Sequence, residues 1–476
     1  MTTIRCIIDE AACISRHQPG IIQGDKVLLY SEWNDLAGAV ADRLKKVGVN
    51  SGDRVAVFLA TDWRTLVLIT GIMRSGAVVC PISTRLPRTV VLEQLRELSC
   101  NRIVAHVSEA SKSEMSGIEV ISPDMLLETP ESAATAVPRF ENNDPCMILF
   151  TSGSGGNPKP AVLSYGNLYY NAQGANANIR VHSNDRWLLN LPIYHVSGIG
   201  VIFRCIMSGA AILIPAANES LADSISKYKP SLVSIVPAQL ADLLRQAGET
   251  SFNSVRVFLV GGSSADPEML QEASQIGLPV YMTYGMTEMA SQITTMPSDA
   301  PPSRRFTTSG RILRHRQLKV DEDGLIHVKG PCLFPGYLKD GKLVRKLDQD
   351  GWFATGDLGT LSDDGYLTVL GRKDHLIISG GENIQPEEVE QELLGIDGIT
   401  CAVVVPVPHK KFGQRPVAFV RSEKLDDKTW RRHLLNRLPS FKVPDAFYSL
   451  PDDLEASGLK IPRKKLAEIA MKLHGH

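Results

Sequence analysis

The sequence predicts an α/β protein: a large N-terminal part of stacked α/β units with a β-rich unit, followed by a small α+β domain. Three observations support this fold class. Short apolar runs alternate with helical patterns over roughly the first two thirds of the chain, the rhythm of βαβ units. From about Ile312, polar and apolar residues alternate around Gly and Asp-Gly turns, as in antiparallel sheet. The chain has 476 residues, more than one core usually covers.

The first elements form a βαβ unit. Apolar residues at helical spacing predict a helix with Ser31 as its N-cap and Gly48 as its stop. A strand at 54–60, a helix from about Asp62 and a strand at 77–83 follow. Further apolar runs bounded by Gly or Pro predict fully buried parallel strands. These runs lie at 145–150, 210–215, 232–237, 255–262 and 278–285, with a helix at 238–248.

The C-terminal third shows a different pattern. Segments 325–340 and 351–381 alternate polar and apolar residues between tight turns, which indicates antiparallel strands. A helix follows, with Pro386 suited to its first position and two glutamates suited to the positive end of the helix dipole. Strands at 401–408 and 415–422 complete a small α+β unit.

Charge and cysteine usage narrow the function classes. Because 51 Lys and Arg stand against 52 Asp and Glu, neither nucleic acid nor an anionic membrane is indicated as the main partner. The eight cysteines are scattered without a C-x-x-C pair, which disfavours structural zinc and disulfides and favours the cytoplasm. The N-terminal stretch lacks the apolar core of a secretory signal. Segment 199–217 contains Arg204 and Pro215, so we expect a buried helix and strand there and a soluble protein.

The segment FTSGSGGNPKPA, residues 150–161, has the composition of a phosphate-binding loop. Hydroxyls and glycine amides surround one lysine, directly after an apolar run. It is not a P-loop, because prolines flank Lys159 and oppose the helix whose N-terminus would seat the phosphate. Its composition alone also suits a flexible Gly/Ser connector.

Six further motifs follow this loop and carry a family resemblance. They are LPIYH ending at His195, GGSSADP beginning at Gly261, YGMTE ending at Glu288, TGD ending at Asp357, the segment 371–390, and GLKIPRKK with Lys460. In this order they resemble the core motifs of the adenylate-forming superfamily of acyl-CoA and aryl-CoA ligases, nonribosomal adenylation domains and firefly luciferase. The resemblance covers nearly the whole chain. It implies an enzyme that forms an acyl adenylate from a carboxylate and ATP, then a thioester, with ATP, Mg²⁺ and CoA required.

The resemblance also implies two domains. Residues 1–373 would form the large domain with the ATP and acid pockets, and residues 374–476 a small mobile domain, with Asp374 as the hinge. The small domain would close for adenylation and then rotate for thioester formation. Residues 410–476 hold 15 Lys and Arg against 8 Asp and Glu, which suits solvated helix faces or a domain that closes over a polyanion.

The implied nucleotide site collects residues from several motifs. The loop would wrap the β- and γ-phosphates, Tyr284 would lie on adenine, and Asp357 with Arg372 would bind the ribose. Taken alone, Asp357 is also a common turn residue. The residues implied to contact ATP are Thr151, Ser152, Gly153, Ser154, Gly155, Lys159, Gly261, Gly262, Ser263, Tyr284, Gly285, Thr287, Asp357, Arg372 and Lys460.

Catalytic roles are implied for four residues. Thr287 would donate to the α-phosphate, and Glu288 would ligate Mg²⁺, which prefers oxygen ligands. Lys460 would cancel the repulsion between carboxylate and α-phosphate, although Leu459 interrupts the usual Gly-Lys pair. His195 would orient the carboxylate and gate the path of the thiol without acting as a general base. Taken alone, Glu288 is an ordinary exposed carboxylate and His195 a structural histidine.

The implied pockets for the acid and for CoA lie in separate motifs. The residues implied to contact the acid are His195, Ser197, Gly198, Arg204 and Gly285. Those implied to face CoA are Ser379, Gly380 and Gly381.

Four features of the sequence indicate which acid and which thiol acceptor the enzyme uses. Segments 187–214 and 458–466 are most similar to o-succinylbenzoate–CoA ligases of menaquinone biosynthesis. Arg204 stands in an uncharged stretch and needs an anion, which a dicarboxylate would supply; otherwise it reaches water or caps a helix end. No acidic residue at 191–200 is present to pair a substrate ammonium, and no carrier domain follows Lys460, which favours free CoA.

Alternatives remain at this stage. One is a ligase for another aryl or medium-chain acid, and another is a non-catalytic relative that binds an adenylate. The sequence leaves the oligomeric state open, a homo-oligomer included.

Overall fold

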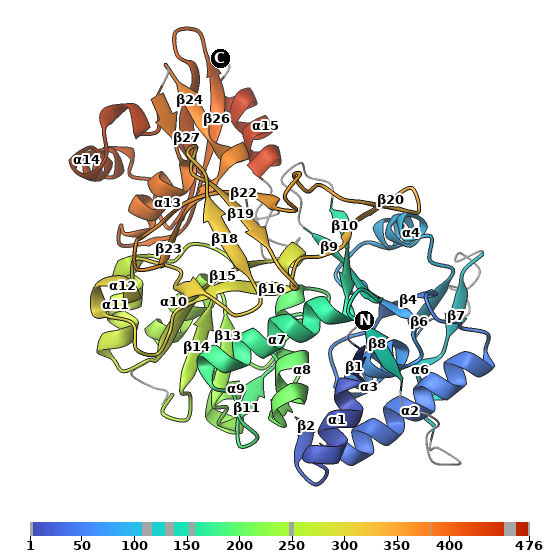
Figure 1. Cartoon of the computed structure of the whole chain (residues 1–476). Coiled ribbons are helices and arrows are strands. Elements are labelled where there is room, and N and C mark those ends of the chain that lie inside the picture. Colours follow the sequence, from blue (N-terminus) through green and yellow to red (C-terminus); the bar gives the residue numbers. More distant parts are fainter. Residues whose placement is uncertain are drawn as a thin grey trace.

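The computed structural model describes residues 3–106, 117–128, 138–151, 158–246, 252–380, 382–451 and 463–474. Within these residues the chain forms two large sheets with helices packed on them, an antiparallel sheet and a C-terminal α+β unit, which confirms the predicted fold class. Figure 1 shows the C-terminal unit, orange to red, standing above the two large sheets.

The first large sheet has a parallel centre and an antiparallel edge. Its strands, in spatial order, are β21 (Lys342–Val344), β20 (Gly336–Lys339), β10 (Lys159–Ser164), β9 (Pro145–Thr151), β5 (Val78–Pro81), β4 (Arg54–Phe58), β6 (Arg102–Ala105) and β7 (Glu119–Ile121). Strands β9, β5, β4, β6 and β7 run parallel, as predicted for β9, β5 and β4, while β10, β20 and β21 are antiparallel to their neighbours. The β-rich part of the chain therefore returns to extend the first sheet.

The second large sheet is parallel through its middle strands. Its strands, in spatial order, are β17 (Arg311–Ile312), β16 (Ser291–Thr295), β15 (Val280–Met286), β14 (Val257–Val260), β13 (Leu232–Ile235), β11 (Arg186–Leu188), β12 (Ala211–Leu213), β2 (Pro19–Gln23) and β3 (Lys26–Leu29). Strands β13 and β14 are buried throughout, as predicted. For β15 full burial was wrong, because its second half borders the site described below.

Helices cover both sheets. They are α1 (Ile7–Ile14), α2 (Tyr30–Lys46), α3 (Trp63–Arg74), α4 (Arg88–Glu97), α6 (Pro123–Leu126), α7 (Tyr165–Ile179), α8 (Val196–Ser208), α9 (Leu221–Tyr228), α10 (Pro237–Arg245), α11 (Pro267–Gln275) and α12 (Pro302–Arg305). One continuous hydrophobic core joins α2, α3, α7 and α8 to strands of both large sheets, with Trp33, Trp187 and Phe203 fully buried in it. Because the two sheets share this core, their facing edges are held together.

Local capping explains where two of these helices begin. The helix predicted from about Asp62 is α3, and Asp62 caps it: its Oδ1 accepts the Thr65 N–H at 2.8 Å. The predicted N-cap Ser31 was wrong: the N-cap of α2 lies two residues earlier, at Leu29. There the Glu32 side chain reaches back and accepts the Leu29 N–H at 2.8 Å, which satisfies that donor without a capping hydroxyl. Gly48, at φ +79°, follows the end of the helix.

The antiparallel sheet lies between the large sheets and the C-terminal unit. Its strands, in order, are β18 (Gln317–Val320), β19 (Leu325–Lys329), β22 (Phe353–Leu361) and β23 (Leu367–Arg372). A two-stranded ribbon, β1 (Thr3–Arg5) with β8 (Arg139–Glu141), lies apart from it.

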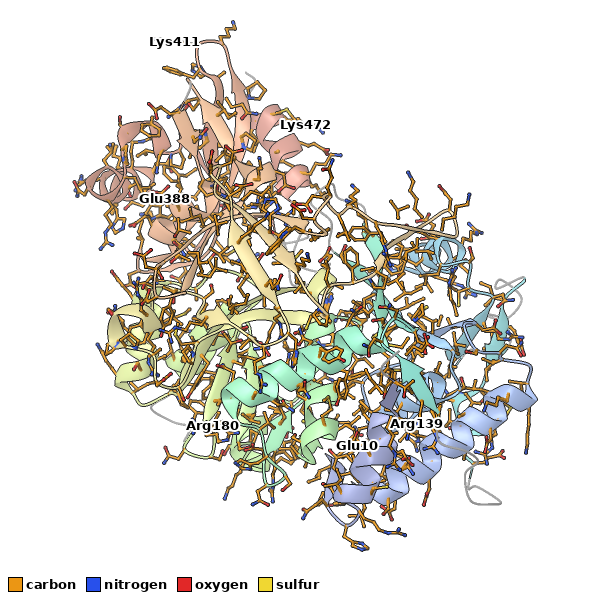
Figure 2. The ribbon with its side chains drawn as sticks, in the orientation of Figure 1. Glu10, Arg139, Arg180, Glu388, Lys411 and Lys472 are labelled. Atoms are coloured by element: carbon orange, nitrogen blue, oxygen red, sulfur yellow. The ribbon has the colours of Figure 1, made fainter. Side chains whose placement is uncertain are left out.

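The C-terminal unit packs helices on both faces of one sheet. Its elements are β24 (Ile377–Ser379), β25 (Glu382–Ile384), α13 (Pro386–Leu394), β26 (Ile399–His409), β27 (Gly413–Ser422), α14 (Asp427–Arg437), β28 (Phe447–Ser449) and α15 (Arg463–His474). Helices α13 and α14 cover one core and α15 another. Pro386 opens α13 as predicted. Part of the basic excess is exposed: Lys411 on the β26–β27 hairpin and Lys472 on α15 point outward (Figure 2).

The apolar segment 199–217 forms the greater part of α8 and the strand β12, as predicted. Among the described residues, no helix combines the length and hydropathy that a membrane crossing requires.

Candidate active site

Three strands bring the predicted adenine and ribose residues together. Tyr284 lies on β15, Asp357 on β22 and Arg372 at the end of β23. The Tyr284 hydroxyl donates to Asp357 Oδ2 at 2.5 Å, and Arg372 Nη1 donates to Asp357 Oδ1 at 2.9 Å. Asp357 and Arg372 also face each other in the antiparallel register of β22 and β23. The structure therefore places the carboxylate and the guanidinium beside the tyrosine.

Burial and nearby carboxylates shift the pKa values of two members of this cluster, Tyr284 and Arg372. Asp357 is 9% exposed, and its main-chain N–H donates to Thr355 Oγ1 at 3.0 Å. Burial, with the adjacent Asp357 charge, raises the pKa of the Tyr284 phenol, so that it stays a donor. Burial alone would lower the pKa of Arg372, but the carboxylates of Asp357 and Asp374 outweigh it and raise that pKa. Tyr284 and Arg372 therefore both remain hydrogen-bond donors to Asp357 at neutral pH.

Glu288 lies in the 3₁₀ turn η1 (Thr287–Met289), which directly follows β15. It is 7% exposed, so the alternative of an ordinary exposed carboxylate is wrong. The Tyr337 hydroxyl donates to Glu288 Oε1 at 2.5 Å. Burial raises the pKa of the Glu288 carboxyl, while the Tyr337 hydrogen bond acts in the opposite direction. Thr287 is half-buried beside it, so the turn presents a hydroxyl and a carboxylate together.

The predicted phosphate loop connects β9 and β10. Its ends, Thr151 and Lys159, face each other in the register of these strands, and Thr151 Oγ1 donates to the Lys159 carbonyl at 3.3 Å. The Lys159 ammonium lies 5.7 Å from the centroid of the Tyr337 ring. The residues Ser152, Gly153, Ser154 and Gly155 lie outside the described part of the chain. Of the described ends, Lys159 therefore lies next to Tyr337, the residue that contacts Glu288.

Glycines at two strand ends allow close backbone approach. Gly261 follows β14, and a Cβ added there would lie 2.7 Å from Thr283 Cγ2. Gly262, at φ +91°, takes the left-handed conformation that glycine favours, with Ser263 exposed after it. Gly285 sits at a β-bulge beside Tyr284, where an added Cβ would lie 2.1 Å from the Ser291 carbonyl oxygen.

The predicted acid-pocket residues gather at the start of α8. His195 is the N-cap residue of this helix, half-buried, and its ring meets that of Tyr194 edge-on at 4.9 Å. Ser197 lies in the first turn. Gly198 is required there, because an added Cβ would lie 2.4 Å from the Pro192 carbonyl oxygen. A tight turn thus packs the LPIYH motif onto the helix.

Arg204, in the body of α8, is 1% exposed. The alternative that it reaches water is therefore wrong. Its Nη2 donates to Ser291 Oγ at 3.0 Å, its guanidinium lies 5.3 Å from the Trp187 ring centroid, and its Nε has no partner among the described residues. Burial, with the nearby Arg316 cation, lowers its pKa to about 9, so it remains charged at neutral pH. Within the described residues, no carboxylate neutralises it.

The predicted CoA turn sits in the small unit. Ser379 is 4% exposed, and its Oγ accepts Arg415 Nη1 at 3.3 Å. Gly380, at φ +62°, donates its N–H to the Phe412 carbonyl at 2.8 Å. Gly381 lies outside the described residues. In Figure 1 the strand β24, which leads into this turn, lies in the upper part of the small unit, well away from β15.

The segment with Lys460 lies outside the described residues, but the residue three positions later is anchored. Arg463, at the start of α15, binds both oxygens of Glu390 and donates to the Val404 carbonyl at 2.8 Å. Arg463 Nη2 also lies 3.5 Å from Glu387, which pairs with His375 at 2.6 Å. The predicted hinge residue Asp374 precedes this histidine and accepts Arg372 Nε at 3.0 Å.

Sequence reasoning missed Tyr337, Ser291 and Trp187. Tyr337 stands in FPGY and Ser291 three residues after YGMTE, in no spacing that links them to Glu288 or Arg204. Their roles come from strand pairing: β20 joins β10, and β16 joins β15.

Comparison with protein families matches the AMP-binding enzyme model over residues 9–338 and the AMP-binding enzyme C-terminal domain over residues 388–458. The chain belongs to the AMP-binding enzyme family. Its predicted membership of the adenylate-forming superfamily is thereby confirmed.

Similar members of the AMP-binding enzyme family share one name. A 2-succinylbenzoate–CoA ligase of Bacillus anthracis is 31% identical over 488 residues, covering 99% of this chain and 100% of the relative. A 2-succinylbenzoate–CoA ligase of Bacillus cereus is 32% identical over 467 residues, covering 95% of each.

Solved structures of the family show the same architecture. The o-succinylbenzoate CoA synthetase (MenE) of Bacillus subtilis in complex with the acyl-adenylate intermediate OSB-AMP superposes with a TM-score of 0.89 at 27% identity, covering 98% of both chains. The same enzyme in complex with ATP and magnesium ion gives a TM-score of 0.88 at 27% identity, covering 98% of this chain and all of the other. The predicted large and small domains thus follow a known architecture.

Proposed function

We propose that this member of the AMP-binding enzyme family is an AMP-forming acid–CoA ligase whose acid is 2-succinylbenzoate. Full-length relatives carry that name, and the similar solved structures hold an acyl adenylate and ATP with magnesium. The observation that carries the choice of acid is Arg204, a buried guanidinium at the acid-pocket helix that has no carboxylate partner among the described residues. A dicarboxylate offers one group for reaction and one for this cation.

Glu288 suits a magnesium ion. Its carboxylate is buried and has no ion-pair partner among the described residues. In the described chain, no cluster of three or more His, Cys, Asp or Glu could hold a metal unaided. Mg²⁺ in nucleotide enzymes needs only one or two carboxylates, because substrate phosphates and water complete its shell. When bound there, the ion supplies charge neutralisation at the phosphates.

In the first half-reaction a carboxylate oxygen of the acid attacks the α-phosphorus. The new acyl–O–P bond forms as the bond to pyrophosphate breaks. Asp357 accepts the ribose hydroxyls, since a carboxylate retains acceptor positions beyond those used by Tyr284 and Arg372. Thr287 donates to the α-phosphate, and Lys460 offsets the repulsion of the two anions. The proposed loop, residues 151–159, with Lys159, holds and then releases the pyrophosphate.

In the second half-reaction the CoA thiol attacks the acyl carbonyl and AMP leaves. We assign residues 1–373 to the large domain and residues 374–476 to the small one, with the hinge at Asp374. The position of β24 in Figure 1 suits this scheme, because the turn 379–381 must rotate to reach the adenylate. His195, at the N-cap of α8, orients the carboxylate and gates the thiol.

The proposed partners are the acid, ATP and CoA. All eight cysteines are free thiols, which suits the cytoplasm, where these substrates occur.

The test incubates the protein with ATP, Mg²⁺, CoA and a panel of acids and identifies products by mass spectrometry. We expect AMP and o-succinylbenzoyl-CoA, formed far more efficiently than benzoyl-CoA or octanoyl-CoA. Thioesters from other acids alone would retain the chemistry and exclude this substrate. Binding of ATP without AMP formation on any acid would favour the non-catalytic alternative.

A further inference from the structure

Tyr337 contacts two charged groups of the proposed nucleotide site. Its hydroxyl donates to Glu288 Oε1 at 2.5 Å, and the face of its ring lies 5.7 Å from the Lys159 ammonium. Glu288 belongs to η1 and Lys159 to the start of β10, two elements far apart in the sequence. One side chain therefore joins the carboxylate proposed for the metal to the lysine proposed for the phosphates.

The backbone around Tyr337 holds it firmly in this place. Tyr337 pairs with Ala161 in the antiparallel register of β20 and β10. Its ring packs edge-on against Phe334 at 4.8 Å, and the Phe334 N–H donates to the Glu288 carbonyl at 2.8 Å. Gly336, at φ +150°, permits the turn, since an added Cβ would lie 2.5 Å from the Val344 carbonyl oxygen. Segment 334–337 thus binds Glu288 at both its main chain and its side chain.

We propose that Tyr337 is a positioning residue for the metal site, whose hydroxyl orients the Glu288 carboxylate toward the magnesium ion of Mg–ATP. This inference rests on the metal role proposed for Glu288. A hydroxyl on one carboxylate oxygen restricts the rotation of the group and leaves the second oxygen for a cation. Partners of this kind, behind a metal ligand, change metal affinity about 10- to 100-fold when they are removed.

The test uses the whole chain with the substitution Tyr337→Phe, which keeps the ring over Lys159 and removes the hydroxyl. Binding of a non-hydrolysable ATP analogue is measured by calorimetry while Mg²⁺ is varied, so no turnover is needed. We expect the Mg²⁺ concentration for half-maximal binding to rise about tenfold, with metal-free binding unchanged. Tyr170→Phe is the matched control, because the Tyr170 hydroxyl on α7 bonds none of the described residues and its loss should change nothing.

A second substitution shows whether Tyr337 acts through Glu288. Glu288→Gln should itself weaken the Mg²⁺ dependence, and adding Tyr337→Phe to it should cause no further loss. If Glu288→Gln leaves Mg²⁺ dependence intact, the metal role of Glu288 fails and the inference fails with it. If Glu288→Gln weakens the Mg²⁺ dependence but Tyr337→Phe does not, the inference alone is overturned. It is also overturned if Tyr337→Phe weakens the Mg²⁺ dependence equally in the wild-type protein and in Glu288→Gln. A lower melting temperature for Tyr337→Phe with unaltered Mg²⁺ dependence also overturns it.

Discussion

The proposed nucleotide side and the proposed acid side of this site are built differently. On the nucleotide side, Asp357 is held by Tyr284 and Arg372, and Glu288 by Tyr337. On the acid side, Arg204 is as deeply buried but meets only a hydroxyl and an indole face among the described residues. The first region is organised by the protein alone, whereas the second is electrostatically complete only with an anion. We therefore propose that specificity for the acid concentrates in this one buried cation.

The largest expected effect comes from Arg204→Met, which removes that cation while keeping most of its volume. We expect kcat/KM for 2-succinylbenzoate to fall about 10²- to 10³-fold, because the second carboxylate loses a buried charged partner. The KM for ATP and the turnover of benzoate should stay near wild type. The melting temperature should not fall, since an unneutralised buried charge is removed.

Arg204→Lys supplies the control for this prediction. A lysine keeps the charge without the planar fork, so its loss should be intermediate. Steady-state kinetics of both variants with 2-succinylbenzoate and with benzoate would check these expectations. An equal loss with benzoate would place Arg204 among structural residues and remove the contrast between the two sides.

The second effect belongs to the nucleotide side. Asp357→Asn should raise the KM for ATP about 10- to 100-fold, because two charge-assisted hydrogen bonds and the ribose acceptor are weakened together. The KM for the acid at saturating ATP should not change. Tyr284→Phe combined with Asp357→Asn should be less than additive, since the two share one hydrogen bond. Equal changes in the KM for ATP and the KM for the acid would contradict the idea that the nucleotide side and the acid side act independently.

The substitution Arg463→Lys tests whether the anchor of α15 in the small domain contributes to adenylation. A lysine cannot bind both oxygens of Glu390, so the segment with Lys460 should be held less firmly. We expect adenylation, measured by pyrophosphate exchange, to slow about tenfold. Thioester formation from a supplied acyl adenylate should be retained. Loss of both half-reactions would indicate that the domain, not the lysine segment, is disturbed.

The smallest effect is expected for Ser291→Ala, which removes the hydroxyl that receives Arg204 Nη2. One hydrogen bond to a charged group is lost while the cation remains, so kcat/KM for 2-succinylbenzoate should fall about fivefold. Nucleotide binding should be unaffected, which fluorescence titration with an ATP analogue would check. A loss as large as that of Arg204→Met would mean that the serine, not the substrate, completes the cation site.

Much of the fold followed from local patterns. Helices α3 and α13 begin near Asp62 and at Pro386, as predicted, and β5, β9, β12, β13 and β14 lie at the predicted apolar runs, whereas the parallel strands β6, β7 and β11 were not predicted. The Ser31 hydroxyl is not the cap of α2, because the Glu32 side chain satisfies the same end of the helix from inside it. The motifs named Tyr284, Asp357, Arg372 and Glu288 as site residues, but not how they meet.

The sequence by itself determined the residue types of the site, their order and the family. Only the tertiary structure decided their partners. Asp357 meets Tyr284 across 73 positions, Arg204 meets Ser291 across 87, and Tyr337 meets Glu288 because β20 returns to pair with β10. The physical reason is range: capping and periodicity act within a few residues, whereas strand pairing and burial bring distant segments together. Whether Arg204 reached water or lay enclosed depended on that packing.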